Sequence, residues 1–283
     1  MIRGLISATF LFLNTVFWCV FLYVFALFKY ILPVRAWREA SSKLTVACAE
    51  NWISCNNWAL GVLQGIRWRI SGLEGLKPDR SYFVCANHQS WTDIVVLQKT
   101  FNRHIPFCRF FIKQQLAYVP LLGLAWMALD FPRMKRYSKE FLQKHPEKRG
   151  EDMATTKKIC AKLRGKPVAI LNFLEGTRFT PAKHQRQQSP YHHLLKPKVG
   201  GIAFALEAMG DQFHALLDVT IYYPRGPVTM WGLLSGGMPE AVVEVQEIPL
   251  PKADDRESLQ TWIHQLWQRK DERLANRLST PHP

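Results

Sequence analysis

Short apolar runs alternate with stretches of helical periodicity along residues 67–283, and this alternation predicts strands separated by helices. The apolar runs predict strands at 67–72, 82–86, 107–112, 167–173, 215–224, 228–234 and 241–248. Apolar spacing predicts helices near Ile94 and over 200–209, and a final helix with a stripe at Leu259, Trp262, Ile263, Leu266 and Trp267. The predicted fold is therefore α/β, a mixed sheet flanked by helices, and we expect the stripe to pack on the sheet rather than on a partner.

The first 66 residues follow a different pattern. No residue from Leu5 to Phe28 is charged, and this segment is longer than the ~20 apolar residues that span a bilayer core. Basic residues are denser after it, at Lys29, Arg35, Arg38 and Lys43, than before it, at Arg3. The positive-inside rule then predicts that the downstream chain lies on the cytoplasmic side of a bacterial inner membrane. We divide the chain into a membrane-anchoring region at 1–66 and a globular domain at 67–283.

Two alternatives stay open within the anchoring region. The apolar segment is either a single span or a re-entrant anchor. Residues 37–68 predict a second helix with few charges, which lies either in the membrane interface or against the globular domain.

A polar stretch directly follows the predicted strand at 82–86. It places His88 at a strand-to-helix junction, where α/β proteins form their ligand crevice, and Asp93 one turn into the next helix. A neutral imidazole can take a proton from a hydroxyl, and a carboxylate on the other ring nitrogen orients it. The alternative is a capping box, with Ser90 as N-cap and Asp93 at position N3.

A second polar stretch follows the buried strand at 167–173. Gly176 permits a close backbone approach to a ligand, Thr177 offers a hydroxyl, and Arg178 offers a donor fork suited to phosphate. Glu175 can accept from a ligand hydroxyl or hold a neighbouring cation. The same four residues also suit an ordinary turn.

Taken together, these motifs resemble the glycerol-3-phosphate and 1-acylglycerol-3-phosphate acyltransferase (PlsC-like) superfamily over roughly 68–224. The first motif is Asn87, His88 and Asp93; the second is Lys113, Leu116, Pro120, Gly123 and Arg133; the third is Phe173 to Arg178. Gln115 and Leu174 depart from the family's usual Glu and Pro. Details near 194–201 and 218–222 are most similar to lysocardiolipin-type members.

The resemblance implies transfer of a fatty acyl group from acyl-CoA or acyl carrier protein to the free hydroxyl of 1-acyl-sn-glycerol-3-phosphate. Lysophosphatidylglycerol and lysocardiolipin are alternative acceptors. His88 is the implied base and Asp93 its partner; the implied substrate-binding residues are Glu175, Gly176, Thr177, Arg178, Lys113 and Arg133. No cofactor or metal is implied, and an acyl-enzyme on Ser90 is a minor rival.

Composition limits the classes of function that remain possible. The formal net charge of +15 and pI of about 9.7 suit anionic lipid, phosphorylated ligands or nucleic acid. No helix-turn-helix, zinc finger or RNP-like pattern is present, so a membrane-anchored nucleic-acid binder is a distant alternative and no nucleic-acid partner is expected. The six cysteines form no Cys-x-x-Cys pair, which is compatible with a reducing compartment. A non-catalytic lipid-binding homologue is disfavoured by the intact His88 and Asp93.

Overall fold

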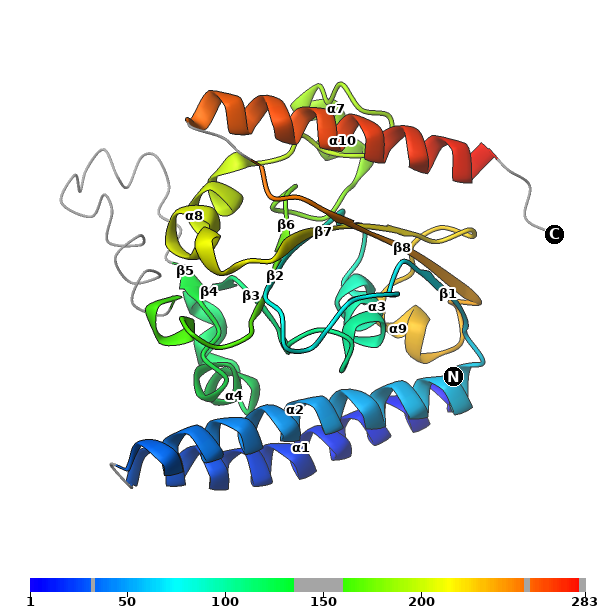
Figure 1. The fold of residues 1–283 in the computed structure, drawn as a ribbon. Coiled ribbons are helices and arrows are strands. Elements are labelled where there is room, and N and C mark those ends of the chain that lie inside the picture. The colour runs from blue at the N-terminus through cyan, green and yellow to red at the C-terminus, as the bar shows by residue number, and fades with distance from the viewer. Residues whose placement is uncertain (32–33, 135–159, 252–254, 280–283) are drawn as a thin grey trace, which may run out of the picture.

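The computed structural model describes residues 1–31, 34–134, 160–251 and 255–279. Its main feature is a six-stranded mixed sheet with helices on both faces, and an antiparallel pair of N-terminal helices lies along one side (Figure 1). The predicted fold class is confirmed.

The sheet places β2 at its centre. Its strands are β1 (Arg67–Ser71), β2 (Tyr82–Ala86), β3 (Cys108–Phe110), β6 (Ala169–Phe173), β7 (Ala215–Tyr222) and β8 (Glu240–Ile248). Their order in space is β1-β8-β7-β2-β6-β3, and every neighbouring pair is parallel except β7 with β8. The carboxyl ends of β2, β6 and β7 therefore meet at one edge, where ligands bind in open α/β sheets.

Side chains of β2 alternate between two apolar cores. Tyr82 and Val84 face a core shared with α3 (Thr92–Phe101) and α9 (Met230–Leu234), whereas Phe83 and Cys85 face a core shared with α8 (Val199–Met209) and α10 (Arg256–Ser279). Leu259, Ile263 and Trp267 of the predicted stripe are buried in the second core. The final helix thus packs on the sheet, as its apolar spacing predicted.

The N-terminal helices are α1 (Ile2–Ile31) and α2 (Arg35–Gln64), and Gly65, which has a φ of 61°, is the C-cap residue of α2. Polar side chains join them: Asn14 donates to Asn56 over 2.7 Å, and Gln64 donates to Ser7 over 2.6 Å. Within the described residues, α1 is the one helix long and apolar enough to cross a membrane, by length and composition only.

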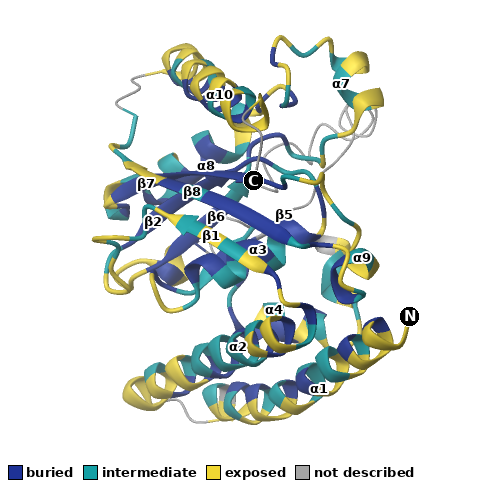
Figure 2. Cartoon of the chain, turned by 90° about the vertical axis from the view of Figure 1, so that its right-hand side faces the viewer, coloured by how far each residue is buried: buried dark blue, intermediate teal, exposed yellow. Residues whose placement is uncertain are grey.

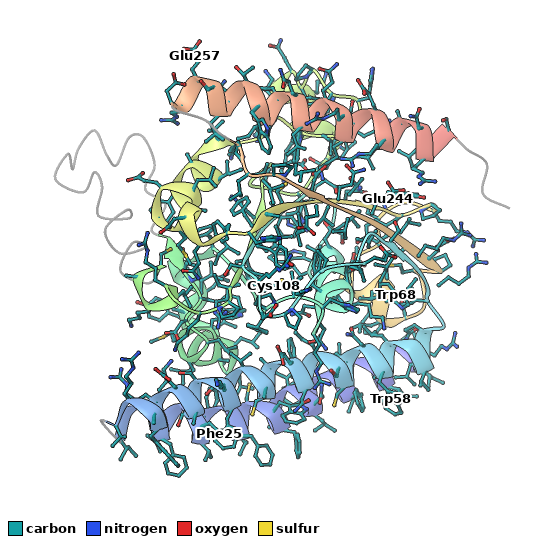
Figure 3. All side chains as sticks on the ribbon, viewed as in Figure 1. Phe25, Trp58, Trp68, Cys108, Glu244 and Glu257 are labelled. Atoms are coloured by element: carbon teal, nitrogen blue, oxygen red, sulfur yellow. The ribbon has the colours of Figure 1, made fainter. Side chains whose placement is uncertain are left out.

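The outward face of α1 is apolar and exposed. It carries Leu5, Phe12, Leu13, Phe17, Val20, Val24 and Leu27. Figure 2 shows this exposed face on the side of the helix pair away from the sheet, and Figure 3 shows its side chains projecting there, with Trp58 of α2 labelled. The buried face of α1 contacts α9 and α4 (Leu122–Ala128).

Two strand predictions were wrong in detail. Residues 228–229 are irregular and Met230–Leu234 form the short helix α9, because the Thr229 hydroxyl caps the helix by accepting from the Gly232 backbone N–H over 3.0 Å. The predicted strand at 107–112 divides into β3, which pairs with β6, and β4 (Ile112–Lys113), which pairs with β5 (Arg133–Met134). The remaining elements are the 3-10 helices η1 (Gln114–Tyr118) and η3 (Gly210–Gln212) and the helix α7 (Pro181–Gln187).

Candidate active site

His88 and Asp93 lie together at the carboxyl end of β2. The Nδ1 atom of His88 is 2.8 Å from Oδ2 of Asp93. Because the ionised carboxylate only accepts, Nδ1 carries the proton and Nε2 is left as a base. Among the described residues, none bonds to Nε2, and the His88 side chain is 12% exposed. The arrangement is able to take a proton from a bound hydroxyl.

Asp93 is completely buried but has several donors. Its Oδ2 also accepts from the backbone N–H groups of Gln89, over 2.6 Å, and Ser90, over 2.9 Å. Only half of the expected capping box forms: Asp93 accepts from the Ser90 N–H, but the Asp93 N–H bonds to the Ser90 carbonyl rather than to its hydroxyl, and the N-cap residue of α3 is Trp91. One carboxylate therefore binds both its own loop and His88. These short local bonds fix the ring-facing oxygen of Asp93 relative to His88.

Tyr223 is a member of the site that the motif analysis did not assign. Its hydroxyl donates to Oδ1 of Asp93 over 2.6 Å. Burial holds the pKa of Tyr223 well above its usual value, and the Asp93 charge raises it further, so the phenol remains a donor. The sequence shows a tyrosine directly after the apolar run that forms β7. It does not show that β7 lies next to β2, which is what brings Tyr223 to Asp93.

The backbone around His88 is held from both neighbouring strands. Asn87 forms two 2.8 Å bonds with the backbone of Ile221, one through its amide nitrogen and one through its amide oxygen. The His88 carbonyl accepts from the Phe179 N–H over 2.7 Å. The imidazole stacks on Phe173 at 3.9 Å between ring centres, with 14° between the planes. The ring therefore has one supported orientation.

Glu175 is fully buried, and both of its carboxylate oxygens bind backbone. Oε1 accepts from the His88 N–H over 2.8 Å, and Oε2 accepts from the Leu195 N–H over 3.0 Å. Burial raises the pKa of the Glu175 carboxyl to about 8, while the two backbone donors oppose the rise. Sequence reasoning assigned Glu175 to substrate contact, but this geometry instead suits a residue that positions His88.

The other residues of the third motif lie beside the His–Asp pair. Gly176 has a φ of 67°, and a Cβ there would lie 3.1 Å from the Lys198 side chain. Thr177 Oγ1 accepts from Lys183 Nζ over 2.8 Å. The guanidinium of Arg178 is exposed and lies 5.0 Å above the Trp91 ring. Trp91 is three residues from His88, so Arg178 stands close to the base.

This edge of the sheet is rich in cations. Within the described residues, Arg178, Lys183 and Lys198 form no ion pair with a carboxylate. Cations without a carboxylate partner suit a phosphate group, and an Arg fork can bind two of its oxygens.

The structure brings the backbones of Lys113 and Arg133 together on the paired strands β4 and β5, where Ile112 is the register partner of Arg133. Their side chains lie outside what the structure describes. The substrate-binding role expected of both residues stays a prediction.

The Ser90 hydroxyl is engaged away from His88. It donates to the Val228 carbonyl and accepts from the Thr92 N–H. This geometry favours His88 as a base acting on a bound hydroxyl over an acyl-enzyme on Ser90. Within the described ranges, no three His, Cys, Asp or Glu side chains are grouped so as to share a metal ion. The expectation of a reaction without metal or cofactor stays a prediction.

An apolar cavity of about 330 Å³ lies between the sheet and the helix pair. Near the site its wall includes Trp91, Ile94 and Leu171; farther away it includes Ile53 of α2 and Trp126 of α4. Apolar walls of this kind suit a hydrocarbon chain.

Comparison with known proteins agrees with this geometry. The family model described as Acyltransferase matches residues 67–230. Lysocardiolipin acyltransferase 1 of Mus musculus is 27% identical over 291 residues, covering 97% of this chain and 73% of the relative. The 1-acyl-sn-glycerol-3-phosphate acyltransferase delta of Mus musculus is 31% identical over 172 residues, covering 56% of this chain and 42% of the relative.

A solved structure shows the same fold. The crystal structure of the 1-acyl-sn-glycerophosphate acyltransferase PlsC from Thermotoga maritima matches with a TM-score of 0.59 and 19% identity, over 99% of each chain. With more than half of its length matched by the family model, and with the motif residues gathered at one edge of a PlsC-like sheet, this chain belongs to the acyltransferase family.

Proposed function

We propose that this protein transfers a fatty acyl group from a thioester, acyl-CoA or acyl carrier protein, to the free hydroxyl of 1-acyl-sn-glycerol-3-phosphate. The observation that carries the proposal is the 2.8 Å contact between His88 Nδ1 and Asp93, which leaves Nε2 as a base beside unpaired cations. The product is phosphatidic acid, a precursor in phospholipid synthesis and remodelling.

The chemistry follows from the state of the imidazole. Nε2 of His88 takes the acceptor hydroxyl proton while the oxygen attacks the thioester carbonyl. The C–S bond of the resulting tetrahedral intermediate then breaks, and the imidazolium returns the proton to the departing thiolate. Asp93 stabilises the imidazolium and holds its orientation throughout.

The cations beside His88 supply acceptor recognition. Arg178 is exposed, is stacked on Trp91 and is within the same turn as Gly176, so a phosphate bound there lies next to the base. Lys183 and Lys198 add positive charge to the same edge. Such a site favours lysolipids with a phosphate close to the reacting hydroxyl. Lys113 and Arg133 are assigned a supporting role toward acceptor or donor phosphates.

The helix pair supplies the membrane contact. The exposed apolar face of α1 enters the bilayer, while Asn14 and Ser7 on its other side remain bonded to α2. A helix held along its length in this way suits an anchor lying in one leaflet, with the site on the cytoplasmic side. The apolar cavity between this pair and the sheet then receives an acyl chain directly from the lipid phase.

The test is acyl transfer in isolated membranes with labelled oleoyl-CoA, a panel of lysophospholipids, and a parallel assay with an acyl-carrier-protein donor. His88→Ala should reduce transfer by at least 10³-fold, because the base is lost. His104→Ala, an exposed histidine outside the site, is the matched control and should retain wild-type turnover. Substantial turnover by His88→Ala would sink the general-base assignment.

Lysocardiolipin is the second candidate acceptor. The mouse lysocardiolipin acyltransferase 1 aligns over 97% of this chain, whereas the mouse 1-acyl-sn-glycerol-3-phosphate acyltransferase delta aligns over 56%. Greater transfer to lysocardiolipin than to 1-acyl-sn-glycerol-3-phosphate in the same panel would select this candidate and leave the mechanism unchanged.

A further inference from the structure

Helix α10 contacts the segment 191–195 through three polar side chains on one helical face. Nδ1 of His264 lies 2.8 Å from the Tyr191 hydroxyl, and the Trp267 indole N–H donates to the Leu195 carbonyl over 3.1 Å. The two oxygens of Asp271 accept from the backbone N–H groups of His192 and His193, each over 2.7 Å. The spacing i, i+3, i+7 places the three side chains on the same face.

That segment leads directly to the base. The Leu195 N–H binds one oxygen of Glu175, and the other oxygen binds the His88 N–H. Leu195 and Glu175 are both completely buried. A continuous set of hydrogen bonds therefore runs from α10 through Leu195 and Glu175 to the residue that carries the base.

The helix itself is fixed to the sheet by a buried ion pair. Lys270 is 0% exposed, and its ammonium lies 2.6 Å from Asp218 on β7. It also donates to the Val219 carbonyl, and Arg273 binds the second oxygen of Asp218. A buried ion pair of this kind favours one position of α10 along β7.

We propose that Asp271 and Trp267 are positioning residues for catalysis, and that they act on His88 through the segment 191–195 and Glu175. Figure 1 shows α10 on the face of the sheet opposite the helix pair. The family model ends at residue 230, before α10 begins at Arg256. The inference rests on the proposed acyl transfer, since its measured quantity is turnover.

The first test is Asp271→Asn in the full-length protein, assayed with the best acceptor of the panel and normalised to the folded fraction. In this variant an amide NH2 group replaces one accepting oxygen and faces a backbone N–H of the segment 191–195, so one hydrogen bond is lost. We expect turnover per folded molecule to fall on the order of 10- to 100-fold, with KM for both substrates unchanged. Leu259→Ala, buried on α10 but apolar, is the control: it should lower thermal stability and keep turnover per folded molecule.

The second test separates positioning through Glu175 from a general loss of order. If the effect passes through Glu175, Asp271→Asn should cost at most about twofold once Glu175→Gln is present, because coupled residues are not additive. Equal losses in both backgrounds, or an equal loss in Leu259→Ala, would overturn the proposal. Trp267→Phe removes the indole donor to Leu195 and should show the same coupling if Asp271→Asn does not fold. An inactive wild type would count against the proposed function, whereas an active wild type with additive losses would count against the positioning role alone.

Discussion

Two turns at the same edge of the sheet each contain a buried carboxylate, and the two carboxylates are held in different ways. In the turn that follows β2 and begins α3, Asp93 accepts from the preceding loop, at Gln89 and Ser90, and from His88. In the turn after β6, Glu175 accepts from two segments distant in sequence, at His88 and Leu195. The first turn is organised locally, and the second connects parts of the fold.

The difference also concerns charge. Asp93 has four donors, including the Tyr223 hydroxyl, and remains suited to stabilise an imidazolium. Glu175 has two donors, and burial raises its pKa to about 8. At equal burial, Asp93 therefore has twice as many donors as Glu175, and such donors offset part of the cost of burying a carboxylate.

The largest effect is expected for the locally organised turn. Asp93→Asn should lower kcat by about 10³- to 10⁴-fold, because an amide donor facing Nδ1 moves the imidazole proton to Nε2 and removes the base. Transfer assays with normalised protein measure this. Asp79→Asn, an exposed acid at the other end of β2, is the control. A loss below tenfold would show that Asp93 acts chiefly by holding the backbone of Gln89 and Ser90.

Arg178→Ala tests the ligand side of the second turn. We expect KM for the phosphate-bearing acceptor to rise about 10- to 100-fold, since one charge-assisted contact is lost, while kcat changes little. Initial rates across acceptor concentrations separate the two constants. Arg164→Ala, which removes an exposed Arg paired with Asp211 at the opposite end of the sheet, should leave KM unchanged. An unaltered KM in Arg178→Ala would remove Arg178 from acceptor binding.

The raised pKa of Glu175 predicts that the stability of the fold depends on pH. Its pKa is about 8 in the folded chain, whereas the ordinary value of 4.5 applies to the unfolded chain. Between these two pH values the folded state therefore binds more protons than the unfolded state. Its contribution is fully present below pH 4.5 and is lost as pH rises through 8. The thermal midpoint of the wild type should therefore fall from pH 5.5 to 8.5 more than that of Glu175→Gln, which cannot ionise. An equal fall of the thermal midpoint between pH 5.5 and 8.5 in both proteins would contradict this.

The smallest effect is expected for Tyr223, whose hydroxyl donates to Asp93. Tyr223→Phe removes one donor and keeps the ring, which corresponds to about 1 kcal/mol, or about fivefold in turnover. The measurement is kcat beside that of Tyr118→Phe, an exposed tyrosine on η1. A loss as large as that of Asp93→Asn would mean that Tyr223 contacts substrate rather than Asp93 alone.

The sequence predicted the parts of the molecule that depend on short-range pattern. The strand at 82–86 and the apolar stripe of α10 follow from periodicity. The five-residue spacing of His88 and Asp93 allowed either a catalytic pair or a capping box, and the resemblance to the acyltransferase motif favoured the pair. The strand expected at 228–234 was wrong because the Thr229 cap and packing against α1 outweighed its apolar run. Local pattern was sufficient where the partners lie within one turn of chain.

Only the tertiary structure decided the rest of the site. It brought Tyr223 to Asp93 and Glu175 to the His88 backbone, because these contacts depend on β7 and β6 lying on either side of β2. It also showed that Glu175 is buried between backbone segments, although its residue type equally suits a ligand contact. Strand order is set by burial of whole faces across the chain, and a single sequence does not state which distant segments share those faces.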